Sequence, residues 1–212
     1  MYFVRPPYLL KKLYPGALWR MPAGNKTIYL TFDDGPIPEI TPWVLEKLKE
    51  YKAQATFFCI GNNVFNYPEI YWEIIDGKHA VGNHTYNHLN GWKTKANVYL
   101  NNIHKCAELI NSNLFRPPYG KITKKQYHSL LTAHQPIGHG GYSIIMWDVL
   151  SGDFNRDTSN EKCLRNSIIN TRDGSVVVFH DSLKAKSNLY YALPRFLDHF
   201  SELGYNFKAI EL

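Results

Sequence analysis

The feature that most constrains the fold is a pair of adjacent carboxylates, Asp33 and Asp34, at the end of a strand-like run. Residues 26–32 are β-branched and aromatic, which predicts a buried strand. A Gly-Pro pair follows and breaks the backbone. Because successive side chains of a strand point to opposite faces, neighbouring Asp residues can share one site only where the strand is ending. We therefore interpret residues 31–36, Thr-Phe-Asp-Asp-Gly-Pro, as the floor of an active site, rather than as carboxylates that only cap the next turn.

The rest of the sequence alternates between strand-like and helix-like segments. Strands are expected at 55–60, 79–83, 114–116, 142–149, 175–179 and 205–212, and helices at 42–51, 68–76, 95–110, 122–131, 161–170 and 189–203. This alternation predicts βαβ units around a parallel sheet. Seven or so strand–helix pairs are enough to curl into a barrel but fall short of the usual eight. Residues 133–141 are rich in Gly and Pro and are expected to form a loop.

Length and composition indicate one globular domain preceded by a short extension. A chain of 212 residues with 44% hydrophobic residues can bury a sizeable core. The formal charge of +6 comes from scattered basic residues, so no nucleic-acid partner is expected. No apolar run is long enough for a transmembrane helix. We expect an N-terminal extension over residues 1–26, a catalytic domain over 27–212, and a monomer.

The N-terminal extension is aromatic and basic, and it has neither a continuous apolar stretch nor a small-residue cleavage site. A standard signal peptide is therefore not expected. A cytoplasmic or peripherally membrane-associated protein is favoured over a secreted one, and contact with a membrane surface through Tyr8, Leu9 and Leu10 stays open. Three widely spaced cysteines, Cys59, Cys106 and Cys163, are interpreted as buried apolar residues and not as a disulfide framework.

Polar residues recur where the expected strands end. They are Asp33 with Asp34, His84, Arg116, the segment 148–153, and His180. In parallel α/β folds the carboxyl ends of the strands are where ligands bind and catalysis occurs. We therefore expect these groups to meet at one edge of the sheet.

His84 and His88 lie four residues apart. If His84 opens a helical turn, both imidazoles lie on one face and can bind the same ion. With Asp34 they would form a His₂Asp set, which suits Zn²⁺ and leaves a position open for water. Taken alone the spacing is weak evidence, because paired histidines are also common on surfaces. Co²⁺, Ni²⁺ and Mn²⁺ remain alternatives to Zn²⁺.

Four ordered motifs resemble those of the polysaccharide deacetylases, carbohydrate esterase family 4, also called the NodB-homology domain. They are residues 31–36 (Thr-Phe-Asp-Asp-Gly-Pro), 84–88 (His-Thr-Tyr-Asn-His), 116–120 (Arg-Pro-Pro-Tyr-Gly) and 178–181 (Val-Phe-His-Asp). The resemblance covers about residues 27–212. It implies a distorted (β/α)₇ barrel and metal-dependent removal of acetyl groups from N-acetylglucosamine-type sugars.

The resemblance also implies roles for individual residues. Asp33 would be the general base, and Arg116 would pair with it and hold it ionised. The metal ligands would be Asp34, His84 and His88. A bound metal would polarise the acetyl carbonyl and lower the pKa of water to about 7, so that a carboxylate can take its proton at neutral pH.

The remaining implied roles concern the oxyanion and the leaving group. The backbone N–H of Tyr119 would face the developing oxyanion, and His180 would protonate the departing amine, which cannot leave as an anion. A further motif departs from the family's usual Asp-x-x-Asp-Trp run. Asp153 keeps the second Asp and could orient His180, whereas Leu150 replaces the first Asp and Phe154 stands where Trp is common.

The expected substrate is an N-acetylated glycan, peptidoglycan or a chitin-like polymer. Pro118, Tyr119, Phe154 and Trp92 are expected to line its binding site. Two enzymatic alternatives are an acetylxylan esterase and a deformylase that acts on a lipid-linked sugar. An alternative of another class is a catalytically silent sugar-binding domain, although the intact set of base, acid and ligands argues against it.

Overall fold

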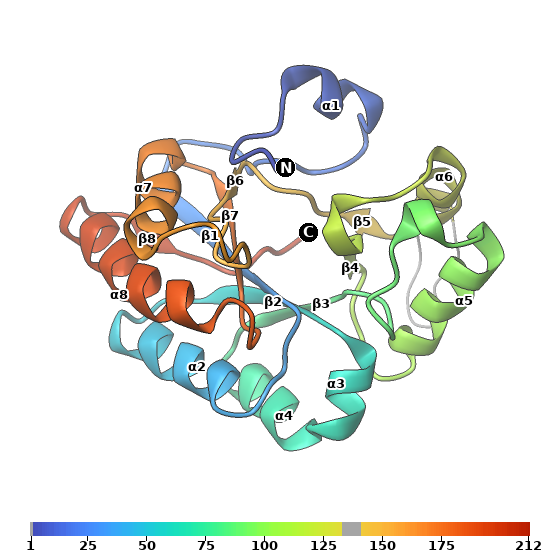
Figure 1. Cartoon of the computed structure of the whole chain (residues 1–212), viewed down its shortest axis with the longest axis horizontal. Coiled ribbons are helices and arrows are strands. Elements are labelled where there is room, and N and C mark those ends of the chain that lie inside the picture. The colour runs from blue at the N-terminus through green and yellow to red at the C-terminus, as the bar shows by residue number, and fades with distance from the viewer. Residues whose placement is uncertain (1, 133–140) are drawn as a thin grey trace.

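The computed structural model describes residues 2–132 and 141–212, which form a curled parallel sheet surrounded by helices (Figure 1). The strands are β1 (Thr27–Asp33), β2 (Ala55–Cys59), β3 (Ala80–Asn83), β4 (Leu114–Phe115), β5 (Ser143–Ile144), β6 (Val149–Leu150), β7 (Val176–His180) and β8 (Asn206–Phe207). Their order is β5-β4-β3-β2-β1-β7-β6, and β8 pairs with β1. All these pairings are parallel, which confirms the predicted α/β barrel-like class.

The six expected helices are present in the predicted order, together with α1 and α3, which were not expected. The helices are α1 (Tyr8–Leu13), α2 (Ile40–Glu50), α3 (Gly61–Asn66), α4 (Pro68–Asp76), α5 (Ala96–Ala107), α6 (Lys124–Thr132), α7 (Asn160–Asn170) and α8 (Lys186–Glu202), with the 3-10 turns η1 (Gly91–Lys93) and η2 (Pro118–Gly120). Within the described residues, none of these helices has the length and apolar character needed to cross a membrane.

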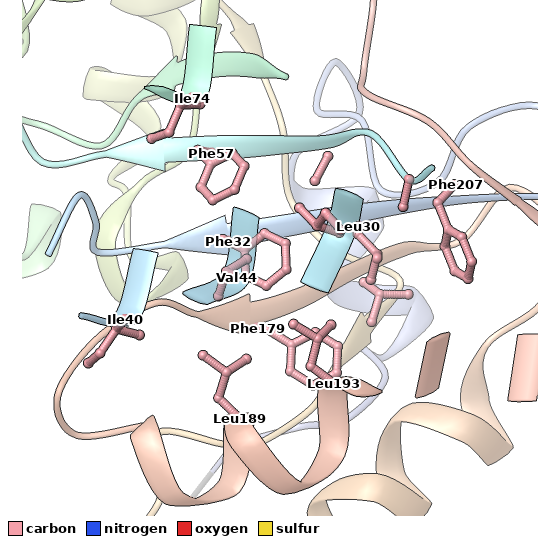
Figure 2. Close-up of a cluster of buried hydrophobic side chains, with 14 of the residues drawn as sticks. Leu30, Phe32, Ile40, Val44, Phe57, Ile74, Phe179, Leu189, Leu193 and Phe207 are labelled. Carbon is pink, nitrogen blue, oxygen red and sulfur yellow. The ribbon is translucent and has the colours of Figure 1, made fainter. Parts of the chain in front are cut away.

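The largest part of the core lies between the central strands and the helices α2 and α8. Figure 2 shows Phe32 and Phe57 near Phe179, with side chains of α2 and α8 packed beside them. The rings of Phe32 and Phe57 stack with their centroids 5.1 Å apart. Complete burial of one such side chain contributes roughly 1.5–3 kcal/mol, so this layer holds the central strands firmly in place.

Strand β1 alternates between this helix layer and the inside of the curled sheet. Ile28, Leu30 and Phe32 belong to the core that faces the helices. Thr31 points inward, where its hydroxyl donates to the Val177 carbonyl and accepts from Arg116. By the same alternation Asp33, the last residue of β1, also faces inward. The strand period therefore places one of the two adjacent carboxylates inside the barrel.

The first residues of the chain pack against the open side of the sheet. The strands at the two ends of the sheet order, β5 and β6, are not paired with each other in the described part of the chain. Leu18 forms a parallel bridge to Ile145, and Arg20 forms an antiparallel bridge to Ser175. Tyr14, Ala17 and Trp19 are buried in a second core cluster. Part of the N-terminal extension thus contributes to the core.

Several expected boundaries were wrong. The strand expected at 142–149 is interrupted and forms β5 and β6, and the last strand is only two residues long. No helix was expected between residues 60 and 68, where the structure has α3, which begins at Gly61. The loop expected at 133–141 lies outside the described residues, apart from Gly141.

Candidate active site

Asp33 is the inward carboxylate at the end of β1, and it forms a buried ion pair with Arg116. The Arg116 guanidinium donates to Asp33 Oδ1 at 2.7 Å, and the two residues are 1% and 5% exposed. Arg116 also donates to the carbonyls of Ile145 and Met146 and to the Thr31 hydroxyl. Each of the three guanidinium nitrogens of Arg116 donates a hydrogen bond, so the buried guanidinium is fixed in position and holds Asp33 in one orientation. The structure thus places Arg116 and Asp33 together as the resemblance implied.

His180 ends β7, the strand beside β1, and it is held by Asp153. Asp33 and His180 are register partners across the two strands. Asp153 is fully buried; its Oδ1 lies 2.8 Å from His180 Nδ1, and its Oδ2 accepts the His180 backbone N–H at 2.7 Å. Burial alone would lower the pKa of His180, but the carboxylates of Asp153, Asp34 and Asp33 together outweigh it and raise that pKa to about 9. The imidazole is therefore protonated at neutral pH, with Nε2 directed away from Asp153.

Asp34, His84 and His88 form a group of three potential metal ligands. Their nearest nitrogen and oxygen atoms all lie within 4.8 Å of one another. Asp34 Oδ1 is 3.2 Å from His88 Nε2 and 3.7 Å from His84 Nε2. Donors bound about 2.0–2.1 Å from one tetrahedral ion are roughly 3.3–3.5 Å apart, so the spacing suits a small divalent cation.

The chemistry of these donors also fits a cation. Asp34 Oδ1 is buried and accepts no hydrogen bond from the described residues. Burial alone would raise the pKa of Asp34, but His88, His180 and His84 hold it below its usual range. His84 Nδ1 lies 2.8 Å from the Arg116 carbonyl oxygen, which can only accept, so Nδ1 carries the hydrogen and Nε2 offers a lone pair. Burial lowers the pKa of His84 to about 4, which keeps the ring neutral.

The two histidines are not brought together by a helix, so that part of the sequence interpretation was wrong. Residues 84–88 are irregular, and Thr85 and His88 have positive φ angles of 64° and 54°. Asp34 and Tyr119 also have positive φ, 86° and 61°. Such conformations cost roughly 1–3 kcal/mol each in non-Gly residues and tend to gather at functional sites. Here the left-handed turn at Asp34 follows the end of β1 and lets it share a site with Asp33.

Asp181 supports this turn, and the sequence analysis assigned it no role. It is fully buried; its Oδ1 accepts the Gly35 N–H at 3.0 Å and its Oδ2 accepts the Thr41 hydroxyl at 2.6 Å. A Cβ on Gly35 would overlap the Asp181 carboxylate, which explains the glycine. Burial raises the pKa of Asp181 to about 8. The position of Asp181, directly after His180, was the available signal.

Asparagine side chains bind backbone groups in the two segments that carry Asp34 and the histidines, and the sequence did not single these asparagines out. Asn63 donates to the Asp34 carbonyl at 2.7 Å. Asn83 accepts the Thr85 N–H at 2.9 Å, and Asn102 accepts the N–H of Tyr86. The contacts of Asn63 and Asn102 join residues from different elements, so no spacing rule predicts them, whereas the contact of Asn83 with Thr85 is a local turn.

Aromatic residues surround the site. The Tyr119 ring lies 4.6 Å from the His88 ring, and no oxygen of the described residues accepts a hydrogen bond from the Tyr119 N–H. The Phe154 ring lies 5.0 Å from the His180 ring. Trp92 is 62% exposed and is fixed by a hydrogen bond from Nε1 to the Ile122 carbonyl. Pro118 is buried in η2, next to Tyr119.

One member of the expected strand-end set lies elsewhere. Asp148 precedes β6, and its N–H donates to the carbonyl of Val176, the first residue of β7. Its carboxylate pairs with Arg5, Lys11 and Arg172. Asp148 therefore lies at the amino ends of β6 and β7, opposite His180, and does not belong to the site. Leu150 is a buried strand residue in β6.

A buried carboxylate and an imidazole with a raised pKa on neighbouring strands, beside three potential cation ligands, are typical of a metal-assisted hydrolase. The chain belongs to the polysaccharide deacetylase family, whose model matches residues 20–134. It is 32% identical to a peptidoglycan-N-acetylglucosamine deacetylase of Bacillus cereus, with 95% of each chain covered. It is 34% identical to a chitooligosaccharide deacetylase of Azorhizobium caulinodans, over 78% of this chain and 79% of the relative.

A solved structure supports the same assignment. The crystal structure of the Bc1960 peptidoglycan N-acetylglucosamine deacetylase matches with a TM-score of 0.83 and 29% identity, covering 97% of this chain and 95% of that chain. The protein is thus an enzyme of the polysaccharide deacetylase family, with the distorted parallel barrel that the resemblance implied.

Proposed function

We propose that this protein hydrolyses the N-acetyl groups of glycans that contain N-acetylglucosamine, with peptidoglycan or a chitin-like polymer as the substrate. The observation that carries the proposal is the register of Asp33 and His180 on adjacent strands, each fixed by a buried partner of opposite charge. The relatives named above, which act on peptidoglycan and chitooligosaccharides, support the same substrate class.

The residues that would hold a cation are Asp34, His84 and His88, and Zn²⁺ is the ion best suited to one carboxylate and two imidazoles. Co²⁺, Ni²⁺ and Mn²⁺ are the alternatives, since geometry and availability decide among them. When bound, such an ion acidifies water and polarises the acetyl carbonyl.

Asp33 is the base in this mechanism. Arg116 binds its Oδ1, so Oδ2 is the oxygen that takes a proton as water attacks the acetyl carbon. The Tyr119 N–H would donate to the oxygen on which negative charge develops. It lies in the first turn of η2, where an N–H has no intrahelical partner, and no acceptor binds it among the described residues.

His180 is the acid. Asp153 holds Nδ1, so Nε2 delivers the proton to the nitrogen as the carbon–nitrogen bond breaks, and the products are acetate and the free amine. A pKa of about 9 keeps this proton available at neutral pH. His180 would thus carry the proton to be delivered, while Asp33, held by Arg116, offers the oxygen that accepts one.

The test is acetate release from chitooligosaccharides by protein stripped with EDTA, before and after Zn²⁺ or Co²⁺ is added. We expect activity to return with the metal. Asp33→Asn should abolish turnover while Zn²⁺, measured by elemental analysis, stays bound. The matched control is Asp76→Asn, which changes an exposed carboxylate at the end of α4. An active Asp33→Asn protein would disprove the assignment of the base.

A further inference from the structure

The first 32 residues carry most of the net charge of the chain. They contain five of the 24 Lys and Arg residues and none of the 18 Asp and Glu residues, which amounts to +5 of the formal +6. The remaining 180 residues hold 19 basic and 18 acidic residues and so carry +1. Arg5 and Lys11 of this segment pair with the buried Asp148 carboxylate, whereas Lys12 forms no ion pair with the described residues and is available to an anionic partner.

The helix α1, in the same segment, presents apolar side chains to solvent. Tyr8, Leu9 and Leu13 are 73%, 72% and 47% exposed. Together with Lys12 they have the i, i+4 spacing that places residues on one face of a helix. Phe3, just before the helix, is 55% exposed. A surface helix ordinarily turns its polar side toward solvent, whereas α1 turns an apolar side toward solvent.

The opposite side of α1 is fixed to the barrel. Leu10 packs against the second core cluster, and Lys11 Nζ lies 3.4 Å from the buried Asp148 carboxylate. Immediately after the helix, the Tyr14 hydroxyl donates to the Ile122 carbonyl at 2.7 Å in a buried hydrogen bond. The apolar face is therefore held outward by specific contacts on its other side.

We propose that Tyr8, Leu9, Lys12 and Leu13, here called the α1 patch, dock on a membrane surface that contains anionic lipid. Lys12 Nζ lies 4.9 Å from the centroid of the Tyr8 ring. An aromatic and aliphatic face with a cation at its border suits the headgroup region, where apolar groups enter the acyl boundary and ammonium groups stay among phosphates.

The shape of the patch favours a lipid surface over a second copy of the chain. Figure 1 shows α1 standing outside the ring of strands, as a projection and not as a groove. The helix α1 has six residues and is therefore about 9 Å long. One face of so short a helix cannot supply the area of about 800 Å² that each partner buries in a stable dimer. A small projection with one cation can enter a bilayer, but it is too small for a dimer interface of that size.

Sedimentation with lipid vesicles tests the proposal on the full chain. We expect the wild-type protein to sediment with vesicles of phosphatidylglycerol and phosphatidylcholine, and far less with phosphatidylcholine alone. The double variant Leu9→Ser, Leu13→Ser should weaken partitioning by at least about tenfold, since both side chains lose their burial in lipid. Lys12→Gln should weaken it by about fivefold.

Matched controls separate a membrane contact from a general loss of surface apolarity or charge. Ile169→Ser with Leu203→Ser removes two side chains that are 71% and 50% exposed elsewhere, and it should leave partitioning unchanged. Lys162→Gln, on the exposed side of α7, should also have no effect. The thermal midpoints of all variants should match that of the wild type, because none of these side chains is buried.

Three results would overturn the proposal. The first is a wild-type protein that stays in the supernatant with anionic vesicles, and the second is a Leu9→Ser, Leu13→Ser protein that sediments as well as the wild type. The third is a dimer, detected by light scattering, that this double variant abolishes, which would assign the α1 patch to a second copy of the chain. Acetate release plays no part in these measurements, so their outcome is independent of the proposed activity.

Discussion

Replacing Asp153 by Asn tests how the acid is tuned. The substitution keeps the size of the side chain and removes the charge 2.8 Å from His180 Nδ1. Burial already acts to lower the pKa of His180, and the Asp153 carboxylate is the largest of the effects that oppose it. Without that carboxylate we expect this pKa to fall from about 9 to near its ordinary value of about 6.5.

The size of the effect depends on pH. With a pKa of about 9, roughly 90% of His180 is protonated at about pH 8; with a pKa of about 6.5 the fraction is only about 3%. Asp153→Asn should therefore lower kcat/KM by about 30-fold at about pH 8 and by less than about twofold at about pH 6. The basic limb of the pH profile should move down by about 2.5 pH units.

Acetate release measured across this pH range, at saturating metal, gives the profile. Asp157→Asn, an exposed carboxylate in the same loop, is the matched control and should leave the limb in place. If Asp153→Asn lowers kcat/KM by the same factor at every pH, Asp153 does not set the pKa of the acid and the reasoning fails.

The same pKa shift affects stability, and its sign follows from the direction. Because the pKa of His180 is higher in the folded protein, the folded state binds this proton more tightly than the unfolded state does. The resulting contribution is complete below about pH 6.5 and is lost as the pH rises through about 9. Urea unfolding of the wild type and of Asp153→Asn at several pH values should show this difference.

Three further substitutions give distinct outcomes. Arg116→Met leaves the Asp33 carboxylate buried without its partner and should lower the free energy of unfolding by about 3–5 kcal/mol in urea; a loss below about 1 kcal/mol would contradict a tightly desolvated pair. Asp181→Ala leaves the Gly35 N–H unpaired and should cost about 1–3 kcal/mol in the same assay, more than Asp181→Asn, which keeps an acceptor; equal losses would count against this role. Trp92→Ala should raise KM for chitooligosaccharides by about two- to tenfold with little change in kcat, and an unchanged KM would place Trp92 outside the binding site.

The sequence predicted the order of elements well because each strand–helix step carries its own local signal. The run that ends at Asp33 is apolar and β-branched, and the Gly-Pro pair after it is a strong signal for the end of a strand. The strand expected at 142–149 was wrong for a physical reason. Its middle residues, Met146 and Ile145, give their carbonyls to the Arg116 side chain instead of to a neighbouring strand. A pattern of apolar residues cannot show that a distant guanidinium takes the place of a strand.

The candidate site was less predictable in its geometry than in its members. The spacing of His84 and His88 suggested a helical turn, but the rings meet through two residues with positive φ, Thr85 and His88. Neither is a glycine, so the sequence carries no signal for these conformations. Asp148 was grouped with the site because it is close in sequence to Asp153. It lies instead at the opposite ends of the strands, where it binds the N-terminal segment.

The register of β1 and β7 has a consequence for how enzymes of this type can diverge. Asp33 and His180 are register partners on two hydrogen-bonded parallel strands, so their backbones lie side by side at the spacing of a sheet, about 4.8 Å. Phe154 and Trp92, by contrast, lie on connecting segments outside the strands. Evolution or design can therefore exchange these connecting segments while the backbone spacing of Asp33 and His180 stays constant.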